Sequence, residues 1–219
     1  MAAPRRRTLD TSAWPTRERI LVEASRLFAT RGFLGTSTRD IATAVGIQQP
    51  SMYSHFSSKH AIAEELLRRD LGSGMDAMKR IAGEGGGPAV ELYRYLTWEV
   101  RHDLESPFDL RSLYFGEILQ LPELTEGRRL LKKYDALVLS FLKRGIADRE
   151  FVDVDPAFAK RAIDAVILEV IRSAALERRV SDDEPDLAAS FVLRALLTKP
   201  SRLATIRGAA QRLDAAADV

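Results

Sequence analysis

Apolar residues recur along this chain at intervals of three and four positions, the period of a helix that buries one face. No stretch shows the sustained two-residue alternation and turn signals that predict a β-hairpin. The pattern therefore predicts an all-α protein. The longer helices are expected at 15–31, 57–81, 89–105, 111–119, 126–148, 156–177 and 185–198.

Two short helices are expected between the first and second of these long helices. Ser37 with Asp40 three residues later forms a capping-box-like pair, which predicts a helix start, and Gly46 ends that helix after barely two turns. Pro50 then lies in the first turn of another short helix, where its missing N–H costs nothing. Two short helices around a glycine-containing turn are typical of a helix-turn-helix.

Glycine and proline also indicate the domain organisation. The glycine-rich segment 83–88 separates a first module from a larger helical module that follows it. We expect a flexible basic arm at 1–14, a helix-turn-helix domain at 15–67 with a linking helix to about residue 82, a helical ligand-binding and dimerisation domain at 88–199, and a C-terminal tail at 200–219.

Composition excludes several kinds of chemistry. The chain has no cysteine, so disulfides, thiolate zinc sites and cysteine nucleophiles are excluded. Its three histidines are too scattered to suggest a metal cluster, and we expect neither a metal nor a cofactor. No segment resembles a signal peptide or a membrane span, so a cytoplasmic protein without membrane contact is expected.

The net charge of +2 is unevenly distributed. Residues 1–60 carry nine Lys and Arg against four Asp and Glu, a net charge of +5, which leaves −3 for the remainder. A basic end on a mildly acidic body suits a module that binds a polyanion. Three of those charges are Arg5, Arg6 and Arg7, which form either a solvated tail or an arm that reaches into a neighbouring DNA groove.

Candidate DNA contacts gather on the two short helices. Hydroxyl and N–H groups at a helix start can hold phosphate oxygens, and a glutamine amide can pair with N6 and N7 of adenine. The hydroxyl of Tyr53 could instead be satisfied locally, and His55 could simply pack against the next helix. The predicted contacts are Thr36, Ser37, Thr38, Arg39, Gln48, Gln49, Ser51, Tyr53, His55 and Lys59.

This region resembles the N-terminal signature of the TetR family of bacterial repressors. The resemblance lies in RERILVEASRLFATRGFLGTSTRDIATAVGI at 17–47 and MYSHFSSK at 52–59, and it becomes unspecific after about Leu67. It implies a dimer, structural roles for Phe28, Gly32, Ile41, Ala42, Gly46 and Phe56, phosphate contacts from Tyr53 and Lys59, and positions near the bases for Gln49 and Pro50. Ser54 departs from the family, which often has an aromatic residue there.

The second module carries candidate ligand and dimer residues. Aromatic side chains that converge between helices, with a few polar groups among them, predict a small-molecule pocket, although such stripes are more often core. The predicted pocket residues are Tyr95, Trp98, His102, Phe108, Tyr114, Phe115 and Glu117. Helix 156–177 is apolar on more than one side, so part of it is expected to meet a second copy. The predicted dimer residues are Ile163, Ile167, Val170, Ile171, Phe191 and Ala195.

Together these features predict a homodimeric repressor that binds a palindromic operator in double-stranded DNA and leaves it when an unidentified small molecule binds. A ligand-independent activator or an architectural DNA-binding protein would share the first module but needs no pocket. The predicted pocket is the only feature that would support an enzyme, because the sequence shows no acid/base pair, activated nucleophile or glycine-rich phosphate loop. We therefore expect no enzymatic activity.

Overall fold

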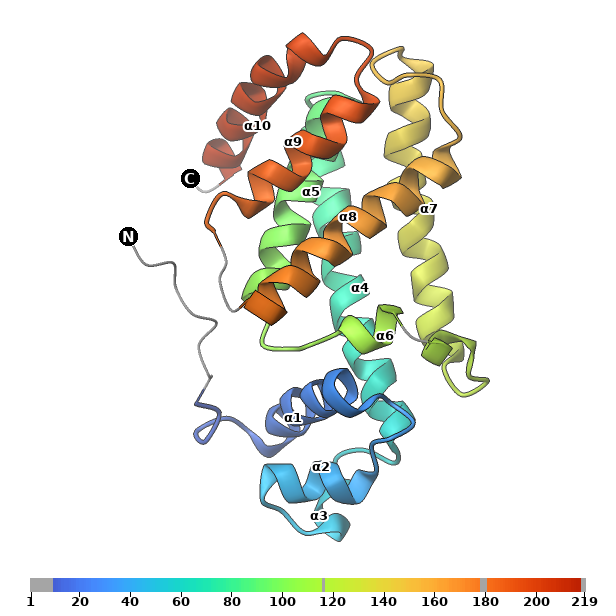
Figure 1. The fold of residues 1–219 in the computed structure, drawn as a ribbon, viewed down its shortest axis with the longest axis vertical. Coiled ribbons are helices and arrows are strands. Elements are labelled where there is room, and N and C mark those ends of the chain that lie inside the picture. The colour runs from blue at the N-terminus through green and yellow to red at the C-terminus, as the bar shows by residue number, and fades with distance from the viewer. Residues whose placement is uncertain (1–9, 116, 178–180, 218–219) are drawn as a thin grey trace. The chain divides into compact units, whose positions relative to one another are not determined.

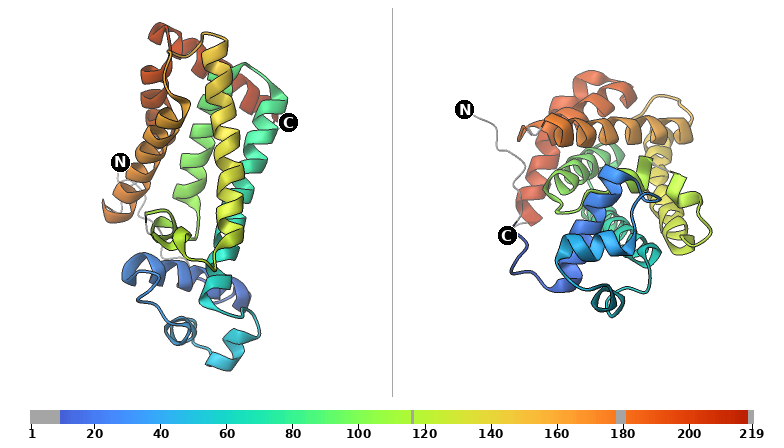
Figure 2. Two further views of the ribbon diagram at one scale, coloured as in Figure 1. Left: turned by 90° about the vertical axis from the view of Figure 1, so that its right-hand side faces the viewer. Right: turned by 60° about the horizontal axis from the view of Figure 1, so that its bottom comes forward.

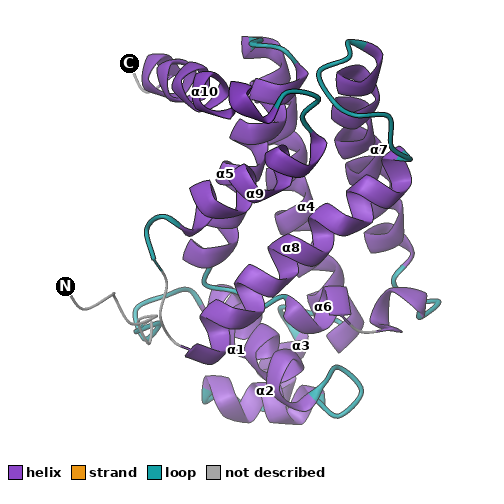
Figure 3. Cartoon of the chain, turned by 45° about the horizontal axis from the view of Figure 1, so that its top comes forward, coloured by secondary structure: helices purple, strands orange, loops and turns teal. Residues whose placement is uncertain are grey.

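The computed structural model describes residues 10–115, 117–177 and 181–217 of the 219-residue chain (Figure 1). These residues form ten α-helices and two short 3-10 helices, and no β-strand occurs among them (Figure 3). The predicted all-α class is thereby confirmed. The described helices include none that is long and apolar enough to cross a membrane. The predicted arm residues Arg5, Arg6 and Arg7 lie outside the described residues.

The contacts divide the chain into two compact units. The N-terminal unit holds the described residues up to Gly72 together with 106–132, and the C-terminal unit holds 73–105 and the described residues from Lys133 onward. Residues 106–132 thus group with the helix-turn-helix region, although we expected them in the second domain. Two helices, α4 (Lys59–Glu84) and α7 (Thr125–Ala147), begin in the N-terminal unit and end in the C-terminal one.

The N-terminal unit is built on α1 (Thr16–Arg31), α2 (Thr38–Val45), α3 (Gln49–Tyr53) and the start of α4. It also contains α6 (Arg111–Phe115), η1 (Glu117–Gln120) and the start of α7. The apolar stripe of α1 is buried as predicted, and α1 packs against α2 and α6. The single helix predicted over 111–119 is observed as α6 followed by η1.

Ion pairs fasten α1 to α4 inside this unit. Arg69 donates two hydrogen bonds to Glu18, of 2.6 and 2.8 Å, and Arg17 donates one of 3.1 Å to Glu65. Burial alone would raise the pKa of Glu65, but hydrogen bonds from Arg68, Arg69 and Arg17 outweigh it and lower that pKa to about 2. Ion pairs as well as apolar contacts therefore hold α1 and the start of α4 together.

The C-terminal unit is centred on α5 (Pro88–Glu105), which packs against α8 (Pro156–Glu177), α9 (Glu184–Leu196) and α10 (Leu203–Ala217). Figure 2 shows the same unit from two further directions, with α5 in light green among the other helices. Nine consecutive residues of α5, from Pro88 to Leu96, are buried. A helix buried on all sides is the natural centre of a helical unit.

The segment expected to be a C-terminal tail, 200–219, is instead largely helical. Residues 200–202 form a short 3-10 helix, η2 (Pro200–Arg202), and α10 follows it. Leu203, Ile206 and Ala210 are buried at helical spacing. Arg94, itself only 1% exposed, donates a hydrogen bond of 2.8 Å to Asp214 and pairs with Glu84. These contacts hold α10 on the unit.

Candidate nucleic-acid interface

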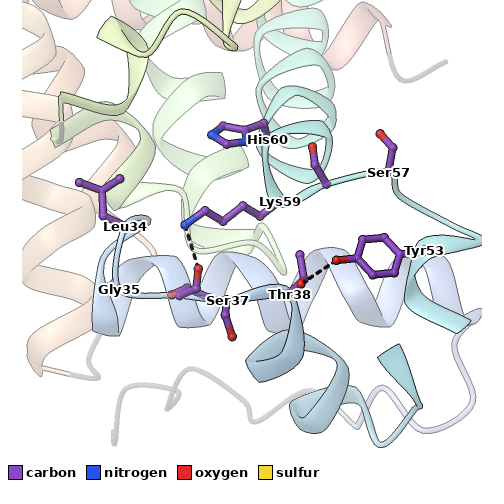
Figure 4. Close-up of a pocket in the computed structure, with 10 residues that line it drawn as sticks. Leu34, Gly35, Ser37, Thr38, Tyr53, Ser57, Lys59 and His60 are labelled. Atoms are coloured by element: carbon purple, nitrogen blue, oxygen red, sulfur yellow. Dashed lines mark hydrogen bonds between the residues drawn. The ribbon is translucent and has the colours of Figure 1, made fainter. Parts of the chain in front are cut away.

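A groove of about 390 Å³ lies within the N-terminal unit, between the α1–α2 loop, the start of α2, the end of α3 and the start of α4 (Figure 4). Its lining residues carry hydroxyl groups, one ammonium group and one imidazole, which suits an anion such as a phosphate. Its lining residues are Leu34, Gly35, Thr36, Ser37, Thr38, Tyr53, Ser57, Ser58, Lys59 and His60.

The capping box predicted at the start of α2 is confirmed. The backbone N–H of Asp40 donates to Ser37 Oγ at 3.1 Å, and the backbone N–H of Ser37 donates to Asp40 Oδ2 at 2.9 Å. The hydroxyl of Ser37 also donates to Asp40 Oδ2, and this bond, followed by the one from the backbone N–H of Ser37, lowers the pKa of Asp40. The cap fixes where α2 begins and so places Thr38 at the edge of the groove.

The turn between α2 and α3 has the geometry expected of a helix-turn-helix. Gly46 ends α2 in the left-handed conformation (φ 74°), which a residue with a Cβ atom adopts only at a cost. Met52 is fully buried and anchors the short helix α3, whose first turn contains Pro50 as predicted. Exposed around this anchor are Gln48, Pro50, Ser51, Ser54 and His55. The polar positions of α3 therefore face away from the core.

Three of the predicted DNA contacts touch one another. Gln49 Nε2 lies 3.3 Å from Thr38 Oγ1 and 3.4 Å from the hydroxyl oxygen of Tyr53, and those two oxygens are 3.3 Å apart. Tyr53 is 49% exposed, so its ring is not buried in the core, although its hydroxyl does have the local partners that the alternative interpretation allowed. The hydrogen bonds from Thr38 and Gln49, in that order, lower the pKa of Tyr53.

Lys59 has a second role that the sequence did not reveal. Its Nζ donates to the carbonyl oxygens of Phe33, at 2.8 Å, and Thr36, at 2.9 Å, and lies 4.5 Å from the centre of the Phe33 ring. Partial burial lowers the pKa of this ammonium group. Lys59 therefore fastens the α1–α2 loop from α4, and Figure 4 shows it reaching across the groove. Its predicted phosphate contact stays a prediction.

Thr36 corrects the sequence analysis. It is 1% exposed, and its hydroxyl donates to the carbonyl oxygens of Gly32, at 2.8 Å, and Leu27, at 3.3 Å. This side chain satisfies the end of α1 and cannot reach a phosphate without leaving the core. The remaining predicted contacts, Ser37, Arg39, Gln48, Pro50, Ser51 and His55, are all exposed and stay predictions.

The predicted ligand residues fall in both units. In the C-terminal unit, the ring of Trp98 stacks on Tyr95 at 6.4 Å and on His102 at 4.7 Å between centroids. Tyr95 is fully buried and its hydroxyl pairs with that of Tyr134; burial is the main reason that the pKa of Tyr95 is raised. This part of the set forms one continuous aromatic stack.

The other predicted ligand residues belong to the N-terminal unit. Phe108 is half-buried, and the hydroxyl of Tyr114 donates to Asp70. The side chains of Phe115 and Glu117 lie outside the described residues. Among the described residues, no group of three or more side chains could hold a metal ion. The assignment of a ligand pocket to this set stays a prediction.

The predicted dimer residues divide into two groups. Ile163 and Ile167 are buried within their own chain, so they are not free to meet a second copy, and their assignment to the interface is wrong. Phe191 is 65% exposed, Ala195 is exposed, and Val170 and Ile171 are half-buried. Three further apolar side chains on the same two helices are exposed: Phe158, Leu176 and Leu187.

Comparisons with known proteins agree on the class of molecule. The model of the family described as "Bacterial regulatory proteins, tetR family" matches residues 20–66. The HTH-type transcriptional repressor KstR2 of Rhodococcus jostii is 30% identical over 156 residues, which cover 68% of this chain and 76% of that protein. KstR2 of Mycolicibacterium smegmatis is 44% identical over 156 residues, covering 67% and 75%.

A solved structure of a similar protein matches most of the chain. The crystal structure of Mycobacterium smegmatis AmtR superposes with a TM-score of 0.76 at 26% identity, over 92% of this chain and 96% of that one. The proteins it resembles are transcriptional regulators rather than enzymes. The chain belongs to the TetR family and is a DNA-binding transcriptional regulator with a helix-turn-helix.

Proposed function

We propose that this protein is a sequence-specific repressor that binds a palindromic operator as a homodimer and leaves it when a small molecule binds. The observation that carries the DNA-binding part is the placement of an exposed polar helix, α3, beside a hydroxyl-lined groove in the same unit. Bases are read by side chains that enter the major groove, whereas phosphate contacts fix the register of the protein on the duplex.

The two tasks fall to different residues. Gln48, Gln49 and Ser51 lie at the start of α3, the end of a recognition helix that meets base edges. Tyr53 and Lys59 line the groove, where a phosphate oxygen would find a hydroxyl and an ammonium group. Arg39, exposed on α2, would add a positive charge to the same surface. This division matches what the family resemblance implies for Tyr53, Lys59 and Gln49.

A second copy of the chain is the partner that the exposed apolar side chains of α8 and α9 favour. Phe158, Leu176, Leu187 and Phe191 are each more than half exposed, and a monomer would leave all four in water. A two-fold dimer would place two recognition helices about one DNA turn apart, roughly 34 Å, and would therefore require a palindromic site.

Release by a small molecule is supported by the continuity of two helices. Both α4 and α7 run from the N-terminal unit into the C-terminal unit, so a ligand that shifts either helix in the C-terminal unit would also move its other end. Ligand and operator would then oppose each other reciprocally, with a coupling on the order of 1–3 kcal/mol.

The experiment combines light scattering with footprinting on DNA from upstream of the protein's own gene. We expect two chains in solution and a protected site with two-fold symmetry. Phe191→Glu should abolish both the dimer and the symmetric protection, whereas Lys143→Glu, which changes an exposed charge on α7, is the control and should keep both. A monomer that protects a symmetric site equally well would contradict the dimer proposal. A compound that binds the dimer tightly yet leaves operator affinity unchanged would contradict release by that ligand.

A further inference from the structure

Thr38, Gln49 and Tyr53 form a small hydrogen-bonded triangle that joins the start of α2 to α3. The three edges are 3.3 Å from Gln49 Nε2 to Thr38 Oγ1, 3.4 Å from Nε2 to the Tyr53 oxygen, and 3.3 Å between the two oxygens. In Figure 4, Thr38 and Tyr53 point toward each other across the groove. Gln49 is half-buried.

The number of available hydrogens decides which atom of the Gln49 amide occupies the triangle. With the nitrogen there, an amide N–H serves the two oxygens and one hydroxyl donates to the other, so all three edges are hydrogen bonds. With the carbonyl oxygen there, both hydroxyls must donate to it, and no hydrogen remains for the edge between Thr38 and Tyr53. The nitrogen arrangement makes one more bond.

This arrangement leaves a defined recognition edge on Gln49. The two N–H bonds of an amide diverge too widely to serve two corners of so small a triangle separately, so one N–H points between the oxygens and the other stays free. When the N–H trans to the carbonyl oxygen is the one in the triangle, the free N–H lies on the same edge as that oxygen. This acceptor and donor form the pair that matches N6 and N7 of adenine. A rotated amide would present these two groups in the opposite order.

We infer that Thr38 and Tyr53 are positioning residues that orient the Gln49 amide and thereby set which base the operator must carry opposite it. This inference rests on the proposed sequence-specific repressor function. It differs from a role confined to phosphate binding, because the loss of a phosphate contact weakens binding to every sequence alike. Loss of a positioning contact instead weakens binding to the preferred base more than to the others.

The test measures base discrimination by the full-length protein. Selection from random DNA with the wild type gives the operator, and Gln49→Ala identifies the base pair whose recognition depends on Gln49. At that position we expect the wild type to prefer the selected base by tenfold or more, as bidentate pairs do. The ratio should fall toward the Gln49→Ala value in both Thr38→Val and Tyr53→Phe.

Controls separate positioning from general damage. Thr38→Ser restores the hydroxyl and should keep the wild-type ratio, and so should Ser57→Ala, which removes a hydroxyl from the same groove but outside the triangle. The double variant Gln49→Ala, Tyr53→Phe should have the same base-discrimination ratio as Gln49→Ala alone. Because discrimination is a ratio for one protein sample, partial unfolding of a variant does not change it.

Three results would overturn the inference. Equal weakening on all DNAs, with the ratio unchanged in both Thr38→Val and Tyr53→Phe, would leave these residues with phosphate contacts only. If the selected operator contains no base pair whose recognition depends on Gln49, then Thr38 and Tyr53 have no base-reading side chain to position. A wild-type protein that selects no sequence at all would overturn the proposed repressor function together with this inference.

Discussion

Replacement of Thr36 by valine should reduce stability without affecting operator binding. Valine keeps the size of threonine but lacks the hydroxyl that donates to Gly32 O at 2.8 Å and to Leu27 O at 3.3 Å. A buried hydrogen bond contributes about 0.5–1.5 kcal/mol net, and a carbonyl left without a partner adds to the loss. With the side chain 1% exposed, water cannot replace that partner, so we expect a loss of about 1–2 kcal/mol.

Urea unfolding followed by circular dichroism would measure this loss. Both proteins are compared at one protein concentration, so that any association of chains affects them equally. Fluorescence anisotropy with an operator fragment would measure DNA affinity. It is done without urea, at a temperature where the variant is fully folded. Thr38→Val is the matched control, since Thr38 is half-exposed in the groove and should show the opposite behaviour. A Thr36→Val protein of unchanged stability that binds operator more than tenfold more weakly would refute the burial argument.

Three further outcomes follow from particular contacts. Ser37→Ala should lower the free energy of unfolding by about 0.5–2 kcal/mol through loss of the helix cap. Because hydrogen bonds from Ser37 lower the folded pKa of Asp40, their contribution with the charged carboxylate is complete above the ordinary pKa of an aspartate and is lost as the pH falls through the folded pKa. Urea titrations that showed the same deficit in acid would contradict this. Gly145→Ala would put a Cβ atom 2.1 Å from the ring of Phe151. The free energy of unfolding should therefore fall by about 1–3 kcal/mol, which thermal unfolding would measure. An unchanged midpoint would show that the ring moves aside without cost. Phe191→Glu should convert dimers to monomers in light scattering, and a dimer that persists would place the interface elsewhere.

Local signals in the sequence were sufficient for most of the fold. The capping box at Ser37, the glycine that ends α2 and the proline that opens α3 act through neighbouring residues, so their pattern predicts their geometry directly. Helix α10 was missed because its alanine-rich sequence has few large apolar residues. Its contacts are with residues distant in the sequence: Leu203 and Ile206 are buried, and Asp214 pairs with Arg94 of α5.

Side-chain direction was the part that periodicity could not supply. Thr36 lies in a loop, where no regular repeat fixes which way a side chain points, and the loop turns it into the core. Helix α8 is apolar on more than one side, and the sequence alone does not tell which side faces its own chain. Ile163 and Ile167 were therefore assigned to the dimer surface although they contact the core, whereas Phe158 on the same helix is exposed.

The most direct test of the account is anisotropy binding of the full-length protein to DNA from upstream of its own gene and to a scrambled fragment, across a salt series. The account predicts tight binding to the native fragment, much weaker binding to the scrambled one, and loss of the difference when Gln49 and Tyr53 are both replaced by alanine. Equal and steeply salt-dependent binding to both fragments would show attraction by charge alone for those sequences, and it would contradict sequence-specific recognition of that DNA.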